Sequence, residues 1–421
     1  MSEITMQIKE LGEQAKQAEA VLASLDTETK NEVLKRAADD LVTKSLQILE
    51  ANEMDLEHAR QINMPLPLQD RLMLSEGRIQ AIAEGMREVA ELEDPIGEVM
   101  QMKKRPNGLL IGQMRVPLGV VGVIYEARPN VTADVFALCF KSGNAVILKG
   151  GKDAFHSNKA IVTILQQTLK EMNLPEFALQ LLEDNSREAS TELMKANEYL
   201  DVLIPRGGAG LIKSVVANAT VPVIETGTGN CHVYVDASAN LDMAADIIVN
   251  AKTQRVGVCN ALESLLVNRS VVEKLIPVLE KRLAKYNVLI HAEPEVLALI
   301  ETASKVEALE EDWGKEYLNY ELSIKVVDSV DEAIAHINRY NTGHSEAIVT
   351  ENYTNAQKFL LNVDAAAVYV NASTRFTDGR EFGLGAEIGI STQKLHARGP
   401  MGLEALTSTK FIIYGSGQIR P

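Results

Sequence analysis

Cys259 is the residue whose type and setting best suit covalent chemistry. It lies in the glycine-containing segment Gln254-Arg255-Val256-Gly257-Val258-Cys259-Asn260, between a helix expected to begin near Asp242 and a later strand. Such a turn exposes a thiol, and a nearby cation such as Arg255, or backbone N–H groups, favours the thiolate, which attacks activated acyl carbons. A free cysteine is more often a small buried hydrophobe, so the segment alone leaves both interpretations open.

The other cysteines are weaker candidates. Cys139 lies in the apolar run 135–140, where a core position is expected, and Cys231 precedes His232 in an expected loop, where adjacent side chains need not point together. Three cysteines are too few and too widely separated for a disulfide framework or a four-ligand zinc site, and the seven histidines include no HExxH pattern. We therefore predict no metal.

Composition limits the class of protein. A chain of 421 residues exceeds the size of a single core, and 46% hydrophobic with 5% aromatic residues is typical of an α/β enzyme. A net charge of -16 argues against nucleic acid or anionic membrane as the main partner, so an anionic substrate needs a local cationic pocket. The opening residues lack the apolar core of a signal peptide, and a cytoplasmic location is expected.

The elements that position these residues can be read from apolar periodicity. Residues 3–92 are predicted to be helical, with Asp26 capping a helix whose buried face carries Leu34, Ala37, Ala38 and Leu41. The prolines at 65–67 interrupt this region. A later amphipathic helix is expected to bury Ile79, Ile82, Met86 and Val89.

Two series of short apolar runs alternate with helical stretches. The first comprises 119–125, 145–148, 178–182, 202–204 and 221–224, and the second comprises 264–267, 287–290, 323–327, 346–349 and 366–370. Apolar strands joined by crossover helices are what a parallel sheet covered on both faces requires. The sequence therefore predicts an α/β fold with two doubly wound parallel-sheet domains.

The order of several motifs resembles the aldehyde dehydrogenase superfamily, and within it the branch that reduces glutamyl phosphate. The motifs are 115–124, Pro129-Asn130 with 146–151, 224–232, the Cys259 turn, and the branch-specific stretch 333–346. The resemblance covers nearly the whole chain. It implies NADPH-dependent reduction of L-glutamyl 5-phosphate to L-glutamate 5-semialdehyde through a Cys259 thioester, in L-proline biosynthesis.

The resemblance also implies roles for individual residues. Asn130 aligns with the side-chain donor to the developing oxyanion, and Glu225 with the glutamate that activates water in oxidising relatives. Lys149 follows an apolar strand, where the cofactor ribose should lie. Lys152 stands where NAD-preferring relatives have a glutamate, so a 2'-phosphate and NADPH are favoured, although a solvated lysine is the alternative.

Other residues are candidates for binding the cofactor or the substrate. Gly207 and Gly208, in a glycine-rich turn before a helix, are expected to approach the cofactor pyrophosphate, or to form a plain tight turn. Candidates for holding substrate phosphate or carboxylate are Arg128, Arg255, Arg375 and Arg398, because guanidinium matches both groups. Arginine also commonly covers a polar surface without binding substrate.

The expected domains follow from the same resemblance. Residues 1–100 and 120–235 would bind NADP(H), 236–380 would be catalytic, and 381–410 would return toward the cofactor domain. Strands at 101–119 with 411–421 would pair between subunits, giving a homodimer or homotetramer. A transient contact with a glutamate 5-kinase is also expected, because this chain has no kinase domain.

Two other functions are compatible with the sequence. The first is an oxidising aldehyde dehydrogenase in which Glu225 directs hydrolysis of the thioester. The second is a catalytically silent protein that keeps the fold to hold the kinase. Phosphate-independent acid production would indicate the former, and an unreactive Cys259 the latter.

Overall fold

A series of helices opens the chain, as its apolar periodicity predicts. In the computed structural model, which describes residues 3–126 and 128–420, these are α1 (Glu3–Leu22), α2 (Thr27–Thr43), α3 (Ser45–Gln61), α4 (Leu66–Leu72) and α5 (Glu76–Glu91). The Asp26 side chain accepts a hydrogen bond from the Thr29 N–H at 2.8 Å, which confirms the predicted cap. The predicted apolar faces of α2 and α5 are buried.

The chain divides into two compact units. The first contains residues 1–226, 383–389 and 401–421, and the second contains 227–382 and 390–400. The predicted boundary near 235 therefore lies later than the division between the units, and residues of the predicted return segment contribute to both.

A four-stranded parallel sheet forms the centre of the first unit. Its order is β5-β4-β3-β6. The strands are β3 (Val120–Tyr125), β4 (Ala145–Gly150), β5 (Leu179–Leu181) and β6 (Val202–Arg206), and the helices between and after them are α6 (Asn130–Lys141), α7 (Phe155–Glu171), α8 (Arg187–Leu193) and α9 (Ala209–Asn218). The strand predicted at 221–224 is reduced to one isolated bridge between Leu203 and Val223.

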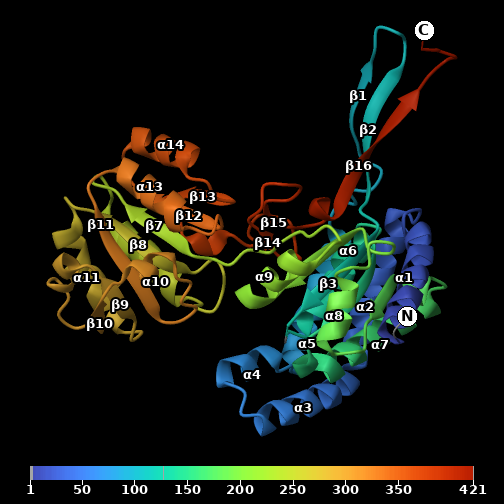
Figure 1. Cartoon of the computed structure of the whole chain (residues 1–421), viewed down its shortest axis with the longest axis horizontal. Coiled ribbons are helices and arrows are strands. Elements are labelled where there is room, and N and C mark those ends of the chain that lie inside the picture. Colours follow the sequence, from blue (N-terminus) through green and yellow to red (C-terminus); the bar gives the residue numbers. More distant parts are fainter. Residues whose placement is uncertain (1–2, 127, 421) are drawn as a thin grey trace. The chain divides into compact units, whose positions relative to one another are not determined.

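A separate antiparallel sheet ends the first unit (Figure 1). It contains β1 (Val99–Lys104), β2 (Leu110–Pro117) and β16 (Thr407–Tyr414), in the order β1-β2-β16. The hairpin predicted at 101–119 and the last strand predicted at 411–414 thus pair within one chain.

The second unit contains a seven-stranded sheet in the order β10-β9-β11-β8-β7-β12-β13, in which every neighbouring pair is parallel. Its strands are β7 (Cys231–Val235), β8 (Leu262–Asn268), β9 (Leu289–Ala292), β10 (Lys305–Glu307), β11 (Glu321–Val327), β12 (Ser345–Val349) and β13 (Ala367–Val370). Its helices are α10 (Leu241–Thr253), α11 (Val272–Ala284), α12 (Pro294–Leu297), α13 (Val330–Tyr340) and α14 (Tyr353–Asn362). Short segments complete the fold: η1 (Lys152–Ala154), η2 (Glu176–Ala178), η3 (Glu310–Gly314), η4 (Thr374–Phe376), η5 (Glu404–Leu406), β14 (Ile390–Ser391) and β15 (Gly399–Pro400).

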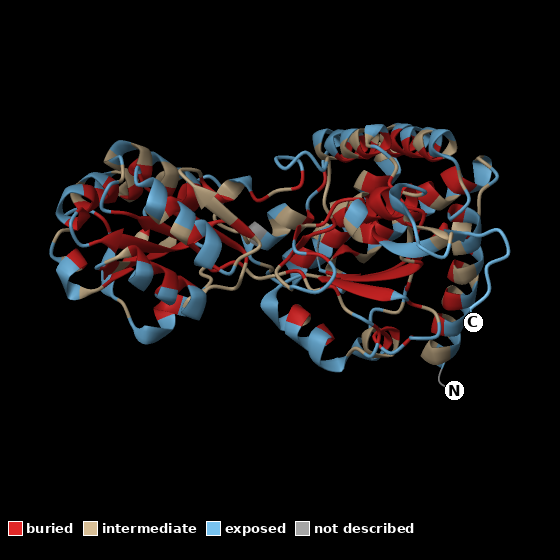
Figure 2. Cartoon of the chain, turned by 90° about the horizontal axis from the view of Figure 1, so that it is seen from above, coloured by how far each residue is buried: buried red, intermediate tan, exposed pale blue. Residues whose placement is uncertain are grey.

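Helices cover both faces of this sheet. Val233 and Leu265 pack in one apolar cluster with residues of α10 and α11, whereas Tyr234 and Leu266 pack in another with residues of α13 and α14. Successive strand residues point to opposite faces, so both sides of β7 and β8 are buried. Figure 2 shows the central strands of both parallel sheets as buried, whereas all residues of the edge strand β10 are exposed. The two doubly wound α/β units confirm the predicted fold class.

Asn52 joins three parts of the first unit. Its amide nitrogen donates to the Leu72 carbonyl at 2.9 Å and to the Ser157 hydroxyl at 3.0 Å, and its amide oxygen accepts from the Leu74 N–H at 2.7 Å. The side chain is buried, so these groups have no ready access to water.

We expect Asn52→Ala to lower the free energy of unfolding by about 1–3 kcal/mol for each backbone group that it leaves unsatisfied. Thermal and urea unfolding, followed by circular dichroism, would measure the change. Gln47→Ala, on an exposed position of the same helix, is the matched control and should change stability by less than about 0.5 kcal/mol. Equal stability of both variants would contradict the bonding role of Asn52.

Candidate active site

Cys259 lies in the turn that joins α10 to β8, at the amino ends of parallel strands in the second unit. β7 begins beside it, because Cys231 is the register partner of Leu262 in β8. The Cys259 residue is half-buried, whereas Cys139 and Cys231 are buried. Cys259 is thus the most accessible cysteine, as its turn predicts, and the core position predicted for Cys139 in α6 is confirmed.

A buried ion pair joins the two ends of the segment that carries Cys259. Lys252, in the last turn of α10, places Nζ 2.6 Å from Oε2 of Glu263 in β8, and both side chains are 0% exposed. Burial lowers the pKa of Lys252 and raises the pKa of Glu263 to about 7, while the charge of each partner acts in the opposite direction. Oε1 of Glu263 also accepts the Leu318 N–H at 3.1 Å.

The backbone of the turn is held from the side of β7. The Cys231 thiol donates to the Cys259 carbonyl oxygen at 3.1 Å. Gly229 approaches so closely that a Cβ there would lie 1.4 Å from the same carbonyl oxygen. The Gly229 N–H donates to Oε1 of Glu316 at 2.7 Å, which fixes this close approach.

Arg375 is brought beside the turn by η4. Its Nε donates to Oε1 of Gln254 at 2.7 Å, and its Nη1 donates to Oδ1 of Asn260. Burial is the main cause that lowers the pKa of Arg375, the nearby charge of Arg255 lowers it further, and Cys259 acts against both. The structure therefore brings together Cys259, Arg255 and Arg375 from the predicted set.

Cys231 and His232 do not lie in a loop, so that prediction is wrong. They begin β7, and both are 0% exposed. The His232 ring Nδ1 lies 3.0 Å from Oε2 of buried Glu346, and burial lowers the pKa of His232 to about 3. The predicted strand series missed β7 because Cys231 and His232 directly follow the polar, glycine-containing stretch 226–230 and were interpreted as part of the same loop.

The predicted cofactor residues gather at one edge of the first unit's sheet. Tyr125 pairs with both Gly150 and Arg206, so β3, β4 and β6 end side by side. Lys149 lies within the end of β4, and Lys152 begins η1 just after it. Burial lowers the pKa of Lys149, while Asp184 acts against this shift. Lys152 is exposed.

Gly207 and Gly208 connect β6 to α9 at the same edge. The Gly208 N–H donates to Oε2 of Glu126 at 2.9 Å, so an anionic group already lies at this helix start. A Cβ on Gly207 would lie 2.7 Å from the Glu126 carboxyl carbon, which explains the glycine there. A cofactor phosphate at Gly208 would have to displace Glu126.

The remaining predicted residues of the first unit follow β3 or the Val223 bridge. Asn130 is the first residue of α6, and its Nδ2 donates to Oδ2 of Asp134 at 2.9 Å. An amide nitrogen carries two hydrogens, so this bond does not exclude a second donation. Arg128 is exposed, and Glu225 is half-buried in an irregular segment just before the division between the units.

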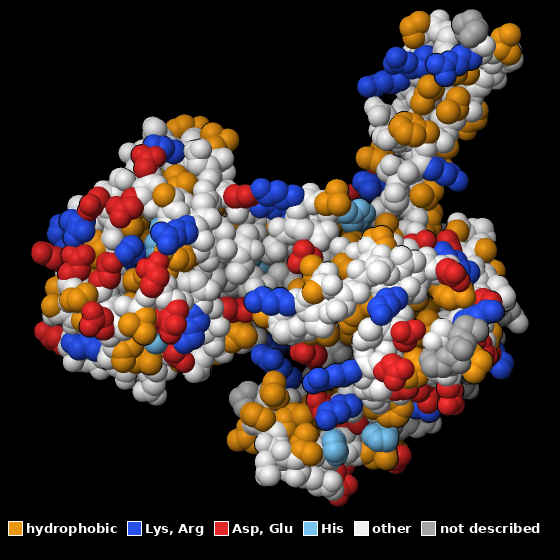
Figure 3. Space-filling view, viewed as in Figure 1, with side chains coloured by type: hydrophobic (Ala, Val, Ile, Leu, Met, Phe, Trp, Pro, Cys, Tyr) orange, Lys and Arg blue, Asp and Glu red, His pale blue; other side chains and the backbone are white. Residues whose placement is uncertain are grey.

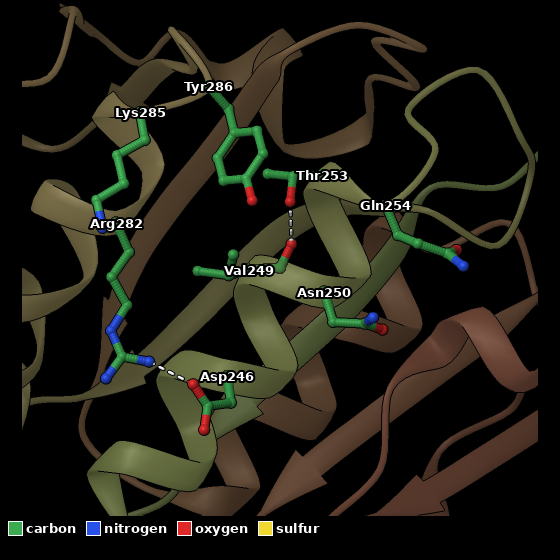
Figure 4. A pocket seen from close by; sticks show the side chains of 8 residues that line it. All are labelled: Asp246, Val249, Asn250, Thr253, Gln254, Arg282, Lys285 and Tyr286. Atoms are coloured by element: carbon green, nitrogen blue, oxygen red, sulfur yellow. Dashed lines mark hydrogen bonds and ion pairs between the residues drawn. The ribbon is translucent and has the colours of Figure 1, made fainter.

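A polar surface pocket of about 560 Å³ lies beside α10 (Figure 4). It is lined by Asp246, Val249, Asn250, Thr253, Gln254, Arg282, Lys285 and Tyr286. Gln254 is drawn there with its side chain directed away from Lys285 and Tyr286, consistent with its bond to Arg375. Cys259 is not among the residues that line this pocket.

Two negative findings apply to the residues that the structure describes. Within 3–126 and 128–420, no group of three or more His, Cys, Asp or Glu residues is placed to hold a metal ion. None of the described helices is both long and apolar enough to cross a membrane.

Sequence reasoning missed the residues that hold the turn. Glu263 is a charged residue in the largely apolar stretch 261–267, a signal that could have indicated a buried carboxylate, whereas Lys252 is followed by polar residues and gives no such signal. Asn260 directly follows Cys259, but its bonds go to residues far along the chain. Gly229 gives no such signal, because the need for glycine arises only from the tertiary approach of Cys259.

Comparison with known proteins agrees with this geometry. The model of the aldehyde dehydrogenase family matches residues 3–310 and 322–412, and so defines the class of the protein. Enzymes of this family use nicotinamide cofactors.

More similar relatives narrow the class. The chain is 59% identical over 413 residues to a gamma-glutamyl phosphate reductase of Enterococcus faecalis, covering 98% of this chain and 99% of that protein. A Clostridium novyi protein of the same name is 59% identical over 406 residues, covering 96% and 97%. The crystal structure of the Thermotoga maritima gamma-glutamyl phosphate reductase matches with a TM-score of 0.95 and 48% identity, covering 98% of this chain and 100% of that one. The chain is an enzyme that belongs to the gamma-glutamyl phosphate reductase branch of the aldehyde dehydrogenase family.

We expect Gly229→Ala to lower the alkylation rate of Cys259 and the turnover rate by about 100-fold or more. The added Cβ would clash with the Cys259 carbonyl oxygen and displace the thiol. A displacement of about 1 Å in a reacting group can lower the rate by about 100-fold. Iodoacetamide labelling with peptide mapping would measure reactivity at Cys259.

Gly210→Ala is the matched control, because no atom lies within 4 Å of a Cβ at that position. Circular dichroism should show both variants folded. Normal labelling of Cys259 in Gly229→Ala would contradict the role assigned to the close approach.

Proposed function

We propose that this enzyme reduces L-glutamyl 5-phosphate to L-glutamate 5-semialdehyde with NADPH, and so serves L-proline biosynthesis in the cytoplasm. The observation that carries the proposal is the half-buried Cys259 thiol in a fixed turn, with Arg375 held beside it. Relatives 59% identical over nearly the whole chain have the name of this reductase activity.

Cys259 is the proposed nucleophile. Its thiolate attacks the acyl carbon, a carbon–sulfur bond forms, and the bond to the phosphate oxygen breaks with phosphate as the leaving group. Reduction of the resulting thioester gives a thiohemiacetal. When its carbon–sulfur bond breaks, the aldehyde leaves and the thiolate is restored.

Asn130 and Glu225 are proposed to assist this chemistry. The Asn130 amide would donate to the negative oxygen that develops on the acyl carbon, together with the backbone N–H of Cys259. Glu225 would move protons or help to position the nicotinamide, because hydrolysis of the thioester would waste the intermediate in a reductase.

The carboxyl edge of the first sheet fits an NADP(H) phosphate and ribose. The Gly208 N–H donates to the Glu126 carboxylate, and it would be able to bind a cofactor phosphate once that carboxylate is displaced. Lys149, Lys152, Gly207 and Gly208 would hold the cofactor, with Lys152 near a 2'-phosphate. Bound NADPH would supply the hydride.

The substrate is an anion, and its proposed ligands are cations. Arg128, Arg255 and Arg375 would bind its phosphate or carboxylate, since a guanidinium forms paired bonds to either group. Arg375 is the best supported of these, because its guanidinium is held by two neighbouring side chains.

A homodimer or homotetramer is proposed through the three-stranded sheet. Phe411, Ile413 and Tyr414 of β16 are 66%, 58% and 61% exposed, and Val99 and Met100 of β1 are 46% and 49% exposed. Hydrophobic side chains line this sheet in Figure 3. A monomer rarely leaves such edge strands uncovered. A transient contact with a glutamate 5-kinase, which would supply the acyl phosphate, remains part of the proposal.

Running the reaction backwards tests the function. Supplied with glutamate 5-semialdehyde and NADP⁺, the enzyme should form NADPH only when inorganic phosphate is present, and Cys259→Ala should abolish the signal. Asn130→Ala should lower kcat by about 10²-fold to 10³-fold. Phosphate-independent turnover that yields glutamate would instead support the oxidising alternative through Glu225, and silence of the wild-type protein would support the scaffold.

A single substitution tests the cofactor proposal. We expect Lys152→Glu to raise the KM for NADP⁺ by about 10-fold or more and to lower the KM for NAD⁺, because a carboxylate repels the 2'-phosphate and can bind the 2'-hydroxyl. Steady-state kinetics with both cofactors would measure the ratio. Lys159→Glu, an exposed lysine of α7, is the control and should leave the preference unchanged. An unaltered ratio in Lys152→Glu would rule out its contact with the 2'-phosphate.

A further inference from the structure

Arg375 is unusual among the arginines of the second unit in what holds it. Arg269 and Arg282 form ion pairs with carboxylates on the surface. The Arg375 guanidinium instead donates to two neutral amides, Gln254 and Asn260. Neutral acceptors fix the plane of a guanidinium without cancelling its positive charge, so that charge remains to act on an anion.

Asn260 is well suited to hold this geometry. It is 4% exposed, and its Nδ2 donates to the Thr377 carbonyl at 2.9 Å. Its backbone carbonyl accepts from the Thr374 hydroxyl at 2.7 Å. Asn260 therefore bonds to Thr374 and Thr377, which lie before and after Arg375 in the sequence. The same short segment positions both Arg375 and the Cys259 thiol.

The charged groups around this segment act on one another. Besides burial, the positive charge of Arg255 lowers the pKa of Arg375, so the two guanidinium groups act on each other. Cys259 and Asp378 act in the opposite direction. Two cations placed near a nucleophile repel each other, and a bound dianion relieves that repulsion more than a monoanion does.

We infer that Arg255 and Arg375 form the binding site for the phosphate group of the acyl phosphate, and for inorganic phosphate in the reverse direction, with Gln254 and Asn260 as positioning residues. This inference rests on the proposed function and assigns one end of the substrate to one cluster of side chains.

The chemistry of the substrate favours phosphate over carboxylate at this site. The phosphate is joined through a single oxygen to the carbon that Cys259 attacks, so it must lie beside the thiol. The α-carboxylate is separated from that carbon by the side chain and is accompanied by an ammonium group, which two arginines would repel. As the carbon–oxygen bond breaks, phosphate retains the electron pair, and fixed cations stabilise that charge.

Reverse kinetics can separate the two ends of the substrate. In Arg375→Gln we expect the KM for inorganic phosphate to rise by about 10-fold to 100-fold, while the KM for glutamate 5-semialdehyde changes by less than about threefold. Gln254→Ala should shift the phosphate KM in the same direction by a smaller factor. Gln254 is exposed, so Gln254→Ala should fold normally. It therefore tests the positioning role even if the corresponding Asn260→Ala variant unfolds. Arg269→Gln, at a surface ion pair of the same unit, is the control and should change neither constant.

Binding can also be measured without turnover. Inorganic phosphate alone should slow iodoacetamide labelling of Cys259 in the wild-type enzyme and in Arg269→Gln, but not in Arg375→Gln. This result would support the phosphate site even if the reductase reaction itself failed. A rise in the aldehyde KM with an unchanged phosphate KM would assign Arg375 to the carboxylate and overturn the inference. Unchanged constants together with undiminished protection by phosphate in Arg375→Gln would overturn it as well.

Discussion

The buried contact between Lys252 and Glu263 is the constraint on which the reactive turn depends. It joins the end of α10 to the start of β8, with both side chains 0% exposed and the charged atoms 2.6 Å apart. Removing one partner of such a pair commonly costs about 3–5 kcal/mol, because the other charge stays buried alone. The turn that carries Cys259 therefore cannot open without exposing or separating these groups. An exposed loop is usually mobile, but the ion pair between the two ends of this loop restrains it.

The two units use opposite edges of their parallel sheets. In the first unit, the predicted cofactor residues lie at the carboxyl ends of β4 and β6, where open α/β sheets usually bind ligands. In the second unit, Cys259 precedes β8 and lies at the amino ends of the strands. Helix dipoles alone cannot stabilise an anion there, so side-chain cations must do so. The presence of Arg255 and Arg375 near Cys259 is consistent with that requirement.

The parts of the fold that sequence reasoning predicted are those set by local pattern. Buried strands such as β3 and β12 are short apolar runs, and α2 and α5 show apolar residues at helical spacing. β10 was missed because all its residues are exposed, and β7 because it begins with Cys231 and His232. In the site, the type and turn of Cys259 left a nucleophile and a buried hydrophobe both open, and the family resemblance favoured the nucleophile. Asn260 and Gly229 were not predictable, since their roles depend on contacts with residues distant in the sequence.

The proposed substrate is an anion, and the protein itself is acidic. The whole chain carries a net charge of -16, and most of the arginines whose contacts the structure describes form ion pairs with nearby carboxylates. A cation paired in this way attracts a further anion only weakly, because its field is largely cancelled at short range. Amide partners avoid this cancellation, since they accept hydrogen bonds without carrying a charge. Because its partners are the amides of Gln254 and Asn260, Arg375 has both a fixed orientation and an available positive charge. A carboxylate in place of either amide would remove that available charge.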